Sequence, residues 1–348
     1  MLDFESWFSS LPKAQVHPSI RHDFFGSLRG LAWTTGNSDH LPPKPVVSVP
    51  LSVVLQSDMD EDNHWDAELA VQLWIECQKG AQSQMSGYCQ FLMQGYDANS
   101  ERSIPPSTAP DALRHWTDEE LAALQTTTAG QKLIQLNVEQ QEKWRLKYNQ
   151  VNNNNNNNMT LEQFQWAMEV VHSRAFKGNF GISTTSTKDD SNLVSTVLPT
   201  LLPPLGAAIA GYAYLQMNPL FPDDKVLAVL ALVAALPLVL NVLKTSSNPP
   251  SAVLLPMIDS ANHKEDADSS IEYDPLSGCF QMSIGPKCLI PSTTDSKDQL
   301  QLCISYGKRS DAELLLNYGF VPGVSSEKEP TEIHRKRLAE AFVARNSS

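Results

Sequence analysis

Residues 253–321 read VLLPMIDSANHKEDADSSIEYDPLSGCFQMSIGPKCLIPSTTDSKDQLQLCISYGKRSDAELLLNYGFV and contain three short motifs. D-x-x-N-H (Asp259–His263) closes one apolar run, and I-S-Y-G (Ile304–Gly307) closes another. E-L-L-L-N-Y-G-F (Glu313–Phe320) follows at the spacing of a short helix. Each motif alone is weak evidence, whereas their order and spacing together are specific.

Together these motifs resemble the SET domain, in the subgroup typified by the Rubisco large-subunit lysine methyltransferases. The resemblance implies an α+β fold, in which a SET-domain β-fold of short strands carries a helical insertion. It also implies S-adenosylmethionine as cofactor and a protein-lysine methyltransferase activity. Asp259, Asn262 and His263 would bind the cofactor. Tyr306 would contact the cofactor as the catalytic tyrosine, and Tyr318 would be the second catalytic residue, lining the lysine channel.

Lysine methylation requires an unprotonated amine aligned with the methyl group of a sulfonium cofactor, and it requires no metal. Deprotonating a free lysine at neutral pH costs about 4–5 kcal/mol. A narrow apolar channel helps, because desolvation disfavours the ammonium form. Tyr318 favours lysine as the acceptor, since a histidine-methylating branch of the subgroup lacks this tyrosine. A protein histidine methyltransferase and a non-catalytic SET-like protein-binding module tethered to a membrane are the alternatives.

The N-terminal stretch predicts short strands after a first helix. Phe4–Ser10 reads as an amphipathic helix and Val46–Pro50 as a strand. Arg29, Gly30 and Leu31 form a predicted glycine turn that enters an apolar strand. Without the resemblance, these residues indicate only a turn between strands. The resemblance implies that these three residues pass close under the cofactor.

Residues 65–171 have the apolar spacing of helices, and the resemblance identifies them as the helical insertion of the subgroup. Thr117 or Asp118 is the predicted N-cap of one helix, with acidic residues in its first turn. The apolar positions are Leu69, Leu73, Trp74 and Cys77, then, more loosely, Leu121, Leu124, Leu133, Leu136 and Val138.

A further predicted helix, residues 164–176, ends in S-R-A-F (Ser173–Phe176). This tetrapeptide matches the subgroup, and the match implies that Arg174 lies beside the cofactor. His172 precedes it, and we interpret it as a solvated helix residue without a partner.

A long insertion separates S-R-A-F from the next motif. Residues 191–222 carry no charge, and residues 226–243 have Asn241 as their only polar side chain. Helices that are apolar all round need burial all round, and both lengths approach the hydrocarbon thickness of a bilayer. We predict an extra hydrophobic helical hairpin that inserts into a membrane through residues 191–243. The alternatives are a soluble hairpin buried against the protein and a gene-model artefact.

Composition limits the partners. A net charge of −13 disfavours nucleic acid as a partner and favours a protein substrate with an accessible lysine. Five cysteines without a C-x-x-C pair indicate neither a disulfide framework nor a zinc site. We expect an intracellular protein, cytoplasmic or nuclear, that is membrane-associated if the hairpin inserts.

The chain therefore divides into six predicted segments. They are 1–56, the N-terminal part of the SET domain; 57–171, the helical insertion; 172–190, the SET segment with S-R-A-F; 191–247, the hydrophobic insertion; 248–322, the C-terminal part of the SET domain with the catalytic motifs; and 323–348, a remnant of a C-terminal helical substrate-binding region.

Overall fold

The computed structural model describes residues 3–25, 28–34, 45–59, 64–94, 104–154, 159–180, 250–291, 299–325 and 329–346. The chain forms two units, Gly178–Ser251 and a larger one made of Met1–Lys177 with Ala252–Ser348. The predicted hairpin at 191–243 lies outside the described residues. Within the described ranges, no helix is long and apolar enough to cross a membrane.

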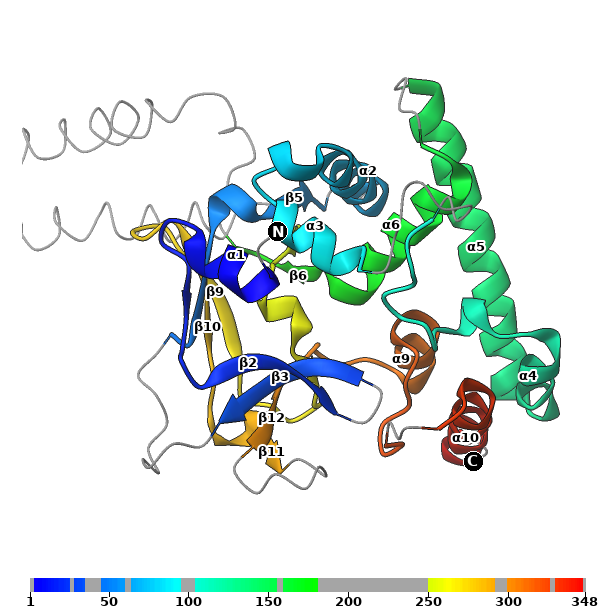
Figure 1. Cartoon of the computed structure of the whole chain (residues 1–348). Coiled ribbons are helices and arrows are strands. Elements are labelled where there is room, and N and C mark those ends of the chain that lie inside the picture. Colours follow the sequence, from blue (N-terminus) through cyan, green and yellow to red (C-terminus); the bar gives the residue numbers. More distant parts are fainter. Residues whose placement is uncertain are drawn as a thin grey trace, which may run out of the picture. The chain divides into compact units, whose positions relative to one another are not determined.

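Short strands form three sheets in the larger unit (Figure 1). The first runs β1 (Gln15–Val16), β4 (Val47–Pro50), β10 (Cys279–Ser283), β9 (Ser270–Asp274), all antiparallel. The second runs β11 (Leu289–Pro291), β12 (Gln299–Ile304), β3 (Leu28–Thr34), β2 (Ile20–Phe25), and β8 (Asn262–His263) joins β12 in parallel. The third runs β5 (Leu55–Asp58), β7 (Ser251–Leu254), β6 (Phe176–Gly178). Strands from both ends of the sequence are therefore neighbours in two of these sheets.

The helices lie mostly between β5 and β6 in sequence and after β12, and the predicted α+β class is confirmed. They are α1 (Phe4–Ser10), α2 (Trp65–Gln78), α3 (Ser86–Leu92), α4 (Asp118–Ala122), α5 (Thr128–Asn154), α6 (Leu161–Arg174), α9 (Asp311–Tyr318) and α10 (Thr331–Arg345). Thr117, Thr160 and Ser310 each begin a helix with a capping box, in which the cap side chain and a Glu or Gln three residues later satisfy each other's backbone N–H groups. The predicted cap at Thr117 is confirmed.

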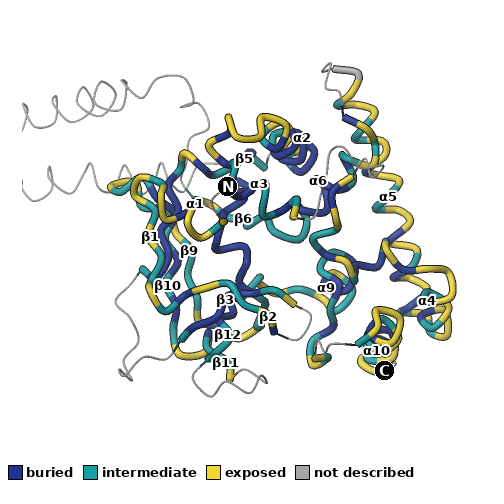
Figure 2. Tube along the Cα trace, viewed as in Figure 1, coloured by how far each residue is buried: buried dark blue, intermediate teal, exposed yellow. Residues whose placement is uncertain are grey.

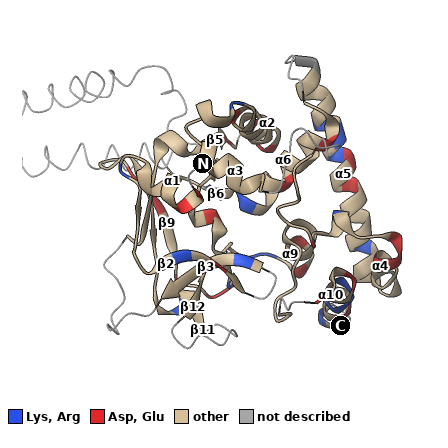
Figure 3. Cartoon of the chain, viewed as in Figure 1, with Lys and Arg blue, Asp and Glu red and all other residues tan. Residues whose placement is uncertain are grey.

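The C-terminal helix α10 packs against α4, α5 and α9. Leu338 and Phe342 of α10 are buried in one apolar cluster with Leu133 of α5 (Figure 2). Figure 3 marks basic residues on α10 and acidic residues on α4, and Arg335 pairs with Glu120 at 2.8 Å. Apolar burial and charge pairing thus both hold α10 to the helical part of the unit.

One expectation about the N-terminal part was wrong. Arg29, Gly30 and Leu31 lie inside strand β3 and form no turn. Leu31 is fully buried. The strand β5, Leu55–Asp58, was not predicted.

Two expectations about the helices were also wrong. Val138 is 61% exposed, whereas Leu133 is buried. Five residues turn a helix by about 140°, so these two positions cannot share a face. His172 is not solvated and unpaired, because its Nε2 lies 3.2 Å from the buried Asp66 carboxylate.

Candidate functional site

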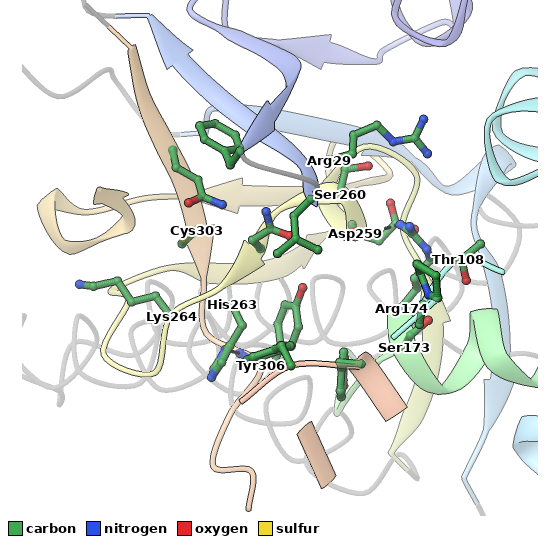
Figure 4. A pocket seen from close by; sticks show the side chains of 18 of the residues that line it. Arg29, Thr108, Ser173, Arg174, Asp259, Ser260, His263, Lys264, Cys303 and Tyr306 are labelled. Atoms are coloured by element: carbon green, nitrogen blue, oxygen red, sulfur yellow. Dashed lines mark hydrogen bonds and ion pairs between the residues drawn. The ribbon is translucent and has the colours of Figure 1, made fainter. Parts of the chain in front are cut away.

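A cavity of about 760 Å³ lies where the strands meet the helices. Its walls come from the β2–β3 end, α3, the loop Pro106–Pro110, the end of α6, the segment Asp259–Glu265 and the residues that follow α9. Figure 4 shows side chains from these separate elements turned toward one another. Residues far apart in the sequence thus line one space.

The first two motifs meet through a parallel strand pair. Asn262 of β8 lies opposite Cys303 of β12, and His263 lies opposite Ile304. The chain reaches β8 through the 3₁₀ turn Ile258–Ser260, which Met257 opens with a positive φ of 77°. A non-glycine residue in this conformation stores about 1–3 kcal/mol of strain, of a kind that clusters at functional sites.

A buried network joins Asp259 to α3 and α6. Its Oδ2 accepts a hydrogen bond from the Tyr88 hydroxyl at 2.5 Å and lies 3.4 Å from Nη1 of Arg174. The same nitrogen donates to the Asp259 carbonyl at 3.2 Å. Burial raises the pKa of Asp259, while the Arg174 charge and the Tyr88 hydroxyl oppose that rise. Asp259 and Arg174 therefore hold each other in place at the cavity wall.

Arg29 reaches the cavity from β3. Its guanidinium carbon lies 3.7 Å from the centroid of the Phe91 ring, and Nη1 donates to Gln94 at 2.6 Å. Burial and the nearby Arg174 charge lower the pKa of Arg29 to about 10. The group therefore keeps its positive charge at neutral pH.

Gly30 is needed because Asn262 occupies the space beside it. A Cβ at Gly30 would lie 2.4 Å from Nδ2 of Asn262, closer than any real Cβ contact. Gly30 and Leu31 do not themselves line the cavity. Gly30 instead packs against the Asn262 side chain, which does line the cavity.

His263 and Tyr306 orient each other. The Tyr306 backbone N–H donates to Nδ1 of His263 at 3.1 Å, and the Tyr306 hydroxyl donates to the Ala261 carbonyl at 2.8 Å. Burial lowers the pKa of His263, in keeping with a neutral ring whose Nδ1 accepts. Burial also raises the pKa of Tyr306, so its hydroxyl stays protonated and keeps oxygen lone pairs free to accept.

An aromatic cluster completes this side of the cavity. The Tyr306 ring stacks on Tyr318 at 5.1 Å between centroids, and His263 lies 5.9 Å from Phe320. Gly319 turns the chain between Tyr318 and Phe320 with a φ of 75°, and a Cβ there would lie 2.4 Å from the Asp111 carbonyl carbon. The third motif therefore needs glycine for both its backbone conformation and its packing.

Four buried polar atoms of cavity-lining residues have no hydrogen-bond partner among the described residues. They are Arg174 Nε, Asp259 Oδ1, Ser260 Oγ and Asn262 Nδ2. A buried polar group left unpaired costs about 1–3 kcal/mol. Two donors, one acceptor and one hydroxyl thus gather at one end of the cavity, and a polar ligand would satisfy them.

Most of the residues predicted from motifs come together. The predicted residues that line the cavity are Arg29, Arg174, Asp259, Asn262, His263, Tyr306 and Tyr318. Sequence reasoning missed Ser260, Phe91 and the loop Pro106–Pro110. The proline-rich segment P-P-S-T-A-P was the available signal for the loop, because prolines stiffen a connection.

Among the described residues, no group of His, Cys, Asp or Glu side chains is arranged to hold a metal ion. All five cysteines are free thiols and buried.

No protein-family model matches the sequence, and no curated protein matches it. Solved structures do match this chain. The SET domain of LSMT bound to lysine and AdoHcy is 17% identical with a TM-score of 0.48, over 91% of this chain and 56% of that chain. Rubisco LSMT bound to AdoMet is 16% identical with a TM-score of 0.46, over 92% of this chain and 56% of that chain. The SET domain of LSMT bound to methyllysine and AdoHcy is 15% identical with a TM-score of 0.48, over 93% and 57%.

This chain thus spans little more than half the length of these solved chains. Two of the three are described as SET domains.

Proposed function

We propose that this chain is an S-adenosylmethionine-dependent protein methyltransferase that transfers methyl groups to a lysine side chain of a non-histone protein. The four unpaired polar atoms at one end of the cavity, next to the stacked tyrosines, carry the proposal. The three sequence motifs support it, since their residues line this one space. We further propose an intracellular location, cytoplasmic or nuclear.

The unpaired atoms fit the amino-acid end of such a cofactor. Arg174 Nε and Asn262 Nδ2 are donors that a carboxylate would accept from. Asp259 Oδ1 is an acceptor that an ammonium group would donate to. When bound, the cofactor supplies a methyl group activated by a sulfonium. Arg174, Asp259, Ser260 and Asn262 are the residues that would hold it.

The chain's own residues would prepare the acceptor. Tyr306 and Tyr318 stack as an aromatic wall, and such a wall excludes water. Removal of water disfavours the ammonium form of a lysine and so favours the neutral amine that reacts. The Tyr306 hydroxyl, fixed by the Ala261 carbonyl, offers its lone pairs to groups in the cavity.

Alignment is the larger contribution expected from such a site. Holding two reactants in line can lower the barrier by about 7–11 kcal/mol. The pairing of β8 with β12 supports this role, because it places Asn262 and Tyr306 on adjoining backbone segments. Tyr318 beside Tyr306 favours lysine over histidine as the acceptor, in line with the subgroup resemblance.

Labelled S-adenosylmethionine tests the proposal. The protein is incubated with cell extract and the cofactor, and the labelled protein and residue are identified by mass spectrometry. We expect label on lysine of a protein other than a histone. Label on histidine would show that histidine, and not lysine, is the acceptor. Calorimetry that detects no binding of S-adenosylhomocysteine would reject the function.

A further inference from the structure

Two side chains of helix α6 hydrogen-bond to the loop Pro106–Pro110. The indole N–H of Trp166 donates to the Pro106 carbonyl at 3.0 Å. One turn later, Oε1 of Glu169 accepts from the backbone N–H groups of Thr108 at 2.7 Å and Ala109 at 3.0 Å. The Ser107 hydroxyl donates to the same oxygen at 2.5 Å. Glu169 is therefore the anchor of the whole loop.

The other oxygen of Glu169 faces two basic residues. Oε2 lies 2.7 Å from Nε2 of His115 and forms an ion pair with Arg114. Burial and the neighbouring Arg114 charge lower the pKa of His115 to about 4, so the ring is neutral, and Nε of Arg114 donates to its Nε2 at 3.3 Å. Burial lowers the pKa of Arg114 only to about 9, so Arg114 is the counter-charge. Glu169 itself is 2% exposed, and among the described residues its carboxylate contacts lie in the segment Ser107–His115.

This segment is also held from the opposite side. Arg335 of α10 donates to the Pro110 carbonyl at 2.8 Å and to the His115 carbonyl at 2.9 Å. The Ala109 carbonyl accepts from the Ala112 N–H at 3.0 Å. Five backbone polar groups of the loop, the N–H groups of Thr108 and Ala109 and the carbonyls of Pro106, Ala109 and Pro110, are therefore bonded to α6, to α10 or within the loop itself. What remains for the cavity is a wall built largely of proline and small side chains.

Glu169 does not line the cavity, but the loop that it binds and two residues that follow it on α6 do. The loop Pro106–Pro110 forms one wall, and Ser173 and Arg174 follow Glu169 by one turn on α6. In Figure 4, Thr108 lies beside Ser173 and Arg174. A single helix thus sets both the loop wall and the arginine at the polar end of the cavity.

We propose that Glu169 is a positioning residue of the cavity, whose buried carboxylate holds Ser107–Ala109 in the conformation that binds the cofactor. This inference rests on the proposed function for the identity of the ligand. The loop contributes an apolar surface of fixed shape, so the cofactor meets a wall that is already ordered. Preorganisation of this kind strengthens binding because no loop has to be ordered when the ligand arrives.

Glu169→Gln tests the inference, with Asp66→Asn as the matched control. Asp66 is buried to a similar degree and also bonds to a residue of α6, His172, but it does not line the cavity or contact the loop. We expect Glu169→Gln to weaken binding of S-adenosylhomocysteine by about tenfold or more, because an amide has one acceptor oxygen and cannot both accept from the loop N–H groups and neutralise the buried Arg114. We expect hydrogen exchange at the Thr108 and Ala109 amides to accelerate by a similar factor.

The control separates positioning from general stability. Asp66→Asn should lower the stability of the fold while leaving the affinity and these two amides unchanged. Unchanged affinity and exchange in Glu169→Gln, with wild-type protein that binds, would overturn the inference and leave the proposed function intact. Wild-type protein that does not bind would overturn both. If Glu169→Gln does not fold, Glu169→Asp keeps the charge but withdraws the carboxylate from the loop, and wild-type affinity in that variant would equally reject the inference.

Discussion

The hydroxyl of Tyr306 is the group whose loss should affect turnover with least effect on structure. We expect Tyr306→Phe to keep cofactor affinity and to lower methyl transfer by about tenfold or more, because one oriented polar group is removed from a desolvated site. The ring contacts with His263 and Tyr318 remain in the variant. Single-turnover rates and calorimetry with S-adenosylhomocysteine measure the two quantities.

Tyr148 offers a control for this variant. Its hydroxyl also donates to a backbone carbonyl, that of Met159 at 2.9 Å, and Tyr148 does not line the cavity. Tyr148→Phe should leave methyl transfer unchanged. Equal rates in Tyr306→Phe and wild type would exclude Tyr306 from the chemistry.

The contact between Gly30 and Asn262 gives a second prediction at the scale of single residues. Gly30→Ala should displace the Asn262 amide and weaken cofactor binding by about tenfold, since a directed hydrogen bond is worth about 1–3 kcal/mol once its loss leaves a partner unpaired. Asn262→Ala should weaken binding by a similar amount. In the Asn262→Ala background, Gly30→Ala should add little, because the amide that would collide is gone. Fully additive losses in this double-mutant cycle would show that Gly30 affects binding through a contact other than the one with Asn262.

Among the elements, α2, α5 and α6 are joined by the buried Asp66. Nζ of Lys147 lies 2.6 Å from the carboxylate, and Nε2 of His172 lies 3.2 Å from it. Burial alone would raise the pKa of Asp66, but His172 and Lys147 outweigh it and hold that pKa below its ordinary value of 3.8. A lowered carboxylate pKa contributes stability that is present above the ordinary value and is lost as the pH falls toward the folded-state value.

Asp66→Asn should therefore destabilise the fold by about 3 kcal/mol at neutral pH, since it leaves Lys147 without its counter-charge. The difference from wild type should shrink between pH 6 and pH 3. Urea unfolding at both pH values measures it. A difference that is the same at both would mean that the ion pair contributes nothing to the pH dependence.

The same elements show how far the sequence predicts this structure. Local signals were reliable: the cap at Thr117 and the helix Phe4–Ser10 depend on neighbouring residues and were predicted correctly. Signals that depend on distant partners were not. Asp66 lies far along the chain from His172, so a lone histidine looked unpaired. Val138 was expected among the apolar positions with Leu133, but the face that α5 buries is set by its tertiary partners, Leu124, α6 and α10 among them.

The candidate site follows the same rule. The motifs predicted which residues line the cavity because their types and spacing are distinctive. Glu169 was missed because its partners lie in a loop that precedes it by about sixty residues. A carboxylate among buried neighbours on α6, where Trp166 and Val170 are also buried, was the available signal.

For the molecule as a whole, the predicted hairpin at 191–243 calls for a deletion test. Strands β6 and β7, which border the smaller unit, are neighbours in one sheet, so a short Gly/Ser linker can replace residues 191–243. If the hairpin inserts into a membrane, the full chain should sediment with membranes and the deletion variant should stay soluble and bind S-adenosylhomocysteine. High-speed centrifugation with and without detergent measures the first outcome. A full-length chain that stays in the supernatant without detergent would reject the membrane reading.

The pairing of Leu31 in β3 with Leu302 in β12 has a consequence for how the protein is made. A ribosome adds about 5–20 residues per second, so β3 waits roughly 15–50 s for the strand that covers its edge. During that interval β2 and β3 can form only a two-stranded hairpin, which is marginally stable in water. The nascent chain therefore carries an uncovered apolar strand through most of its synthesis. We infer that its folding is completed late and that chaperones shield its unpaired strand edges for a long part of its synthesis.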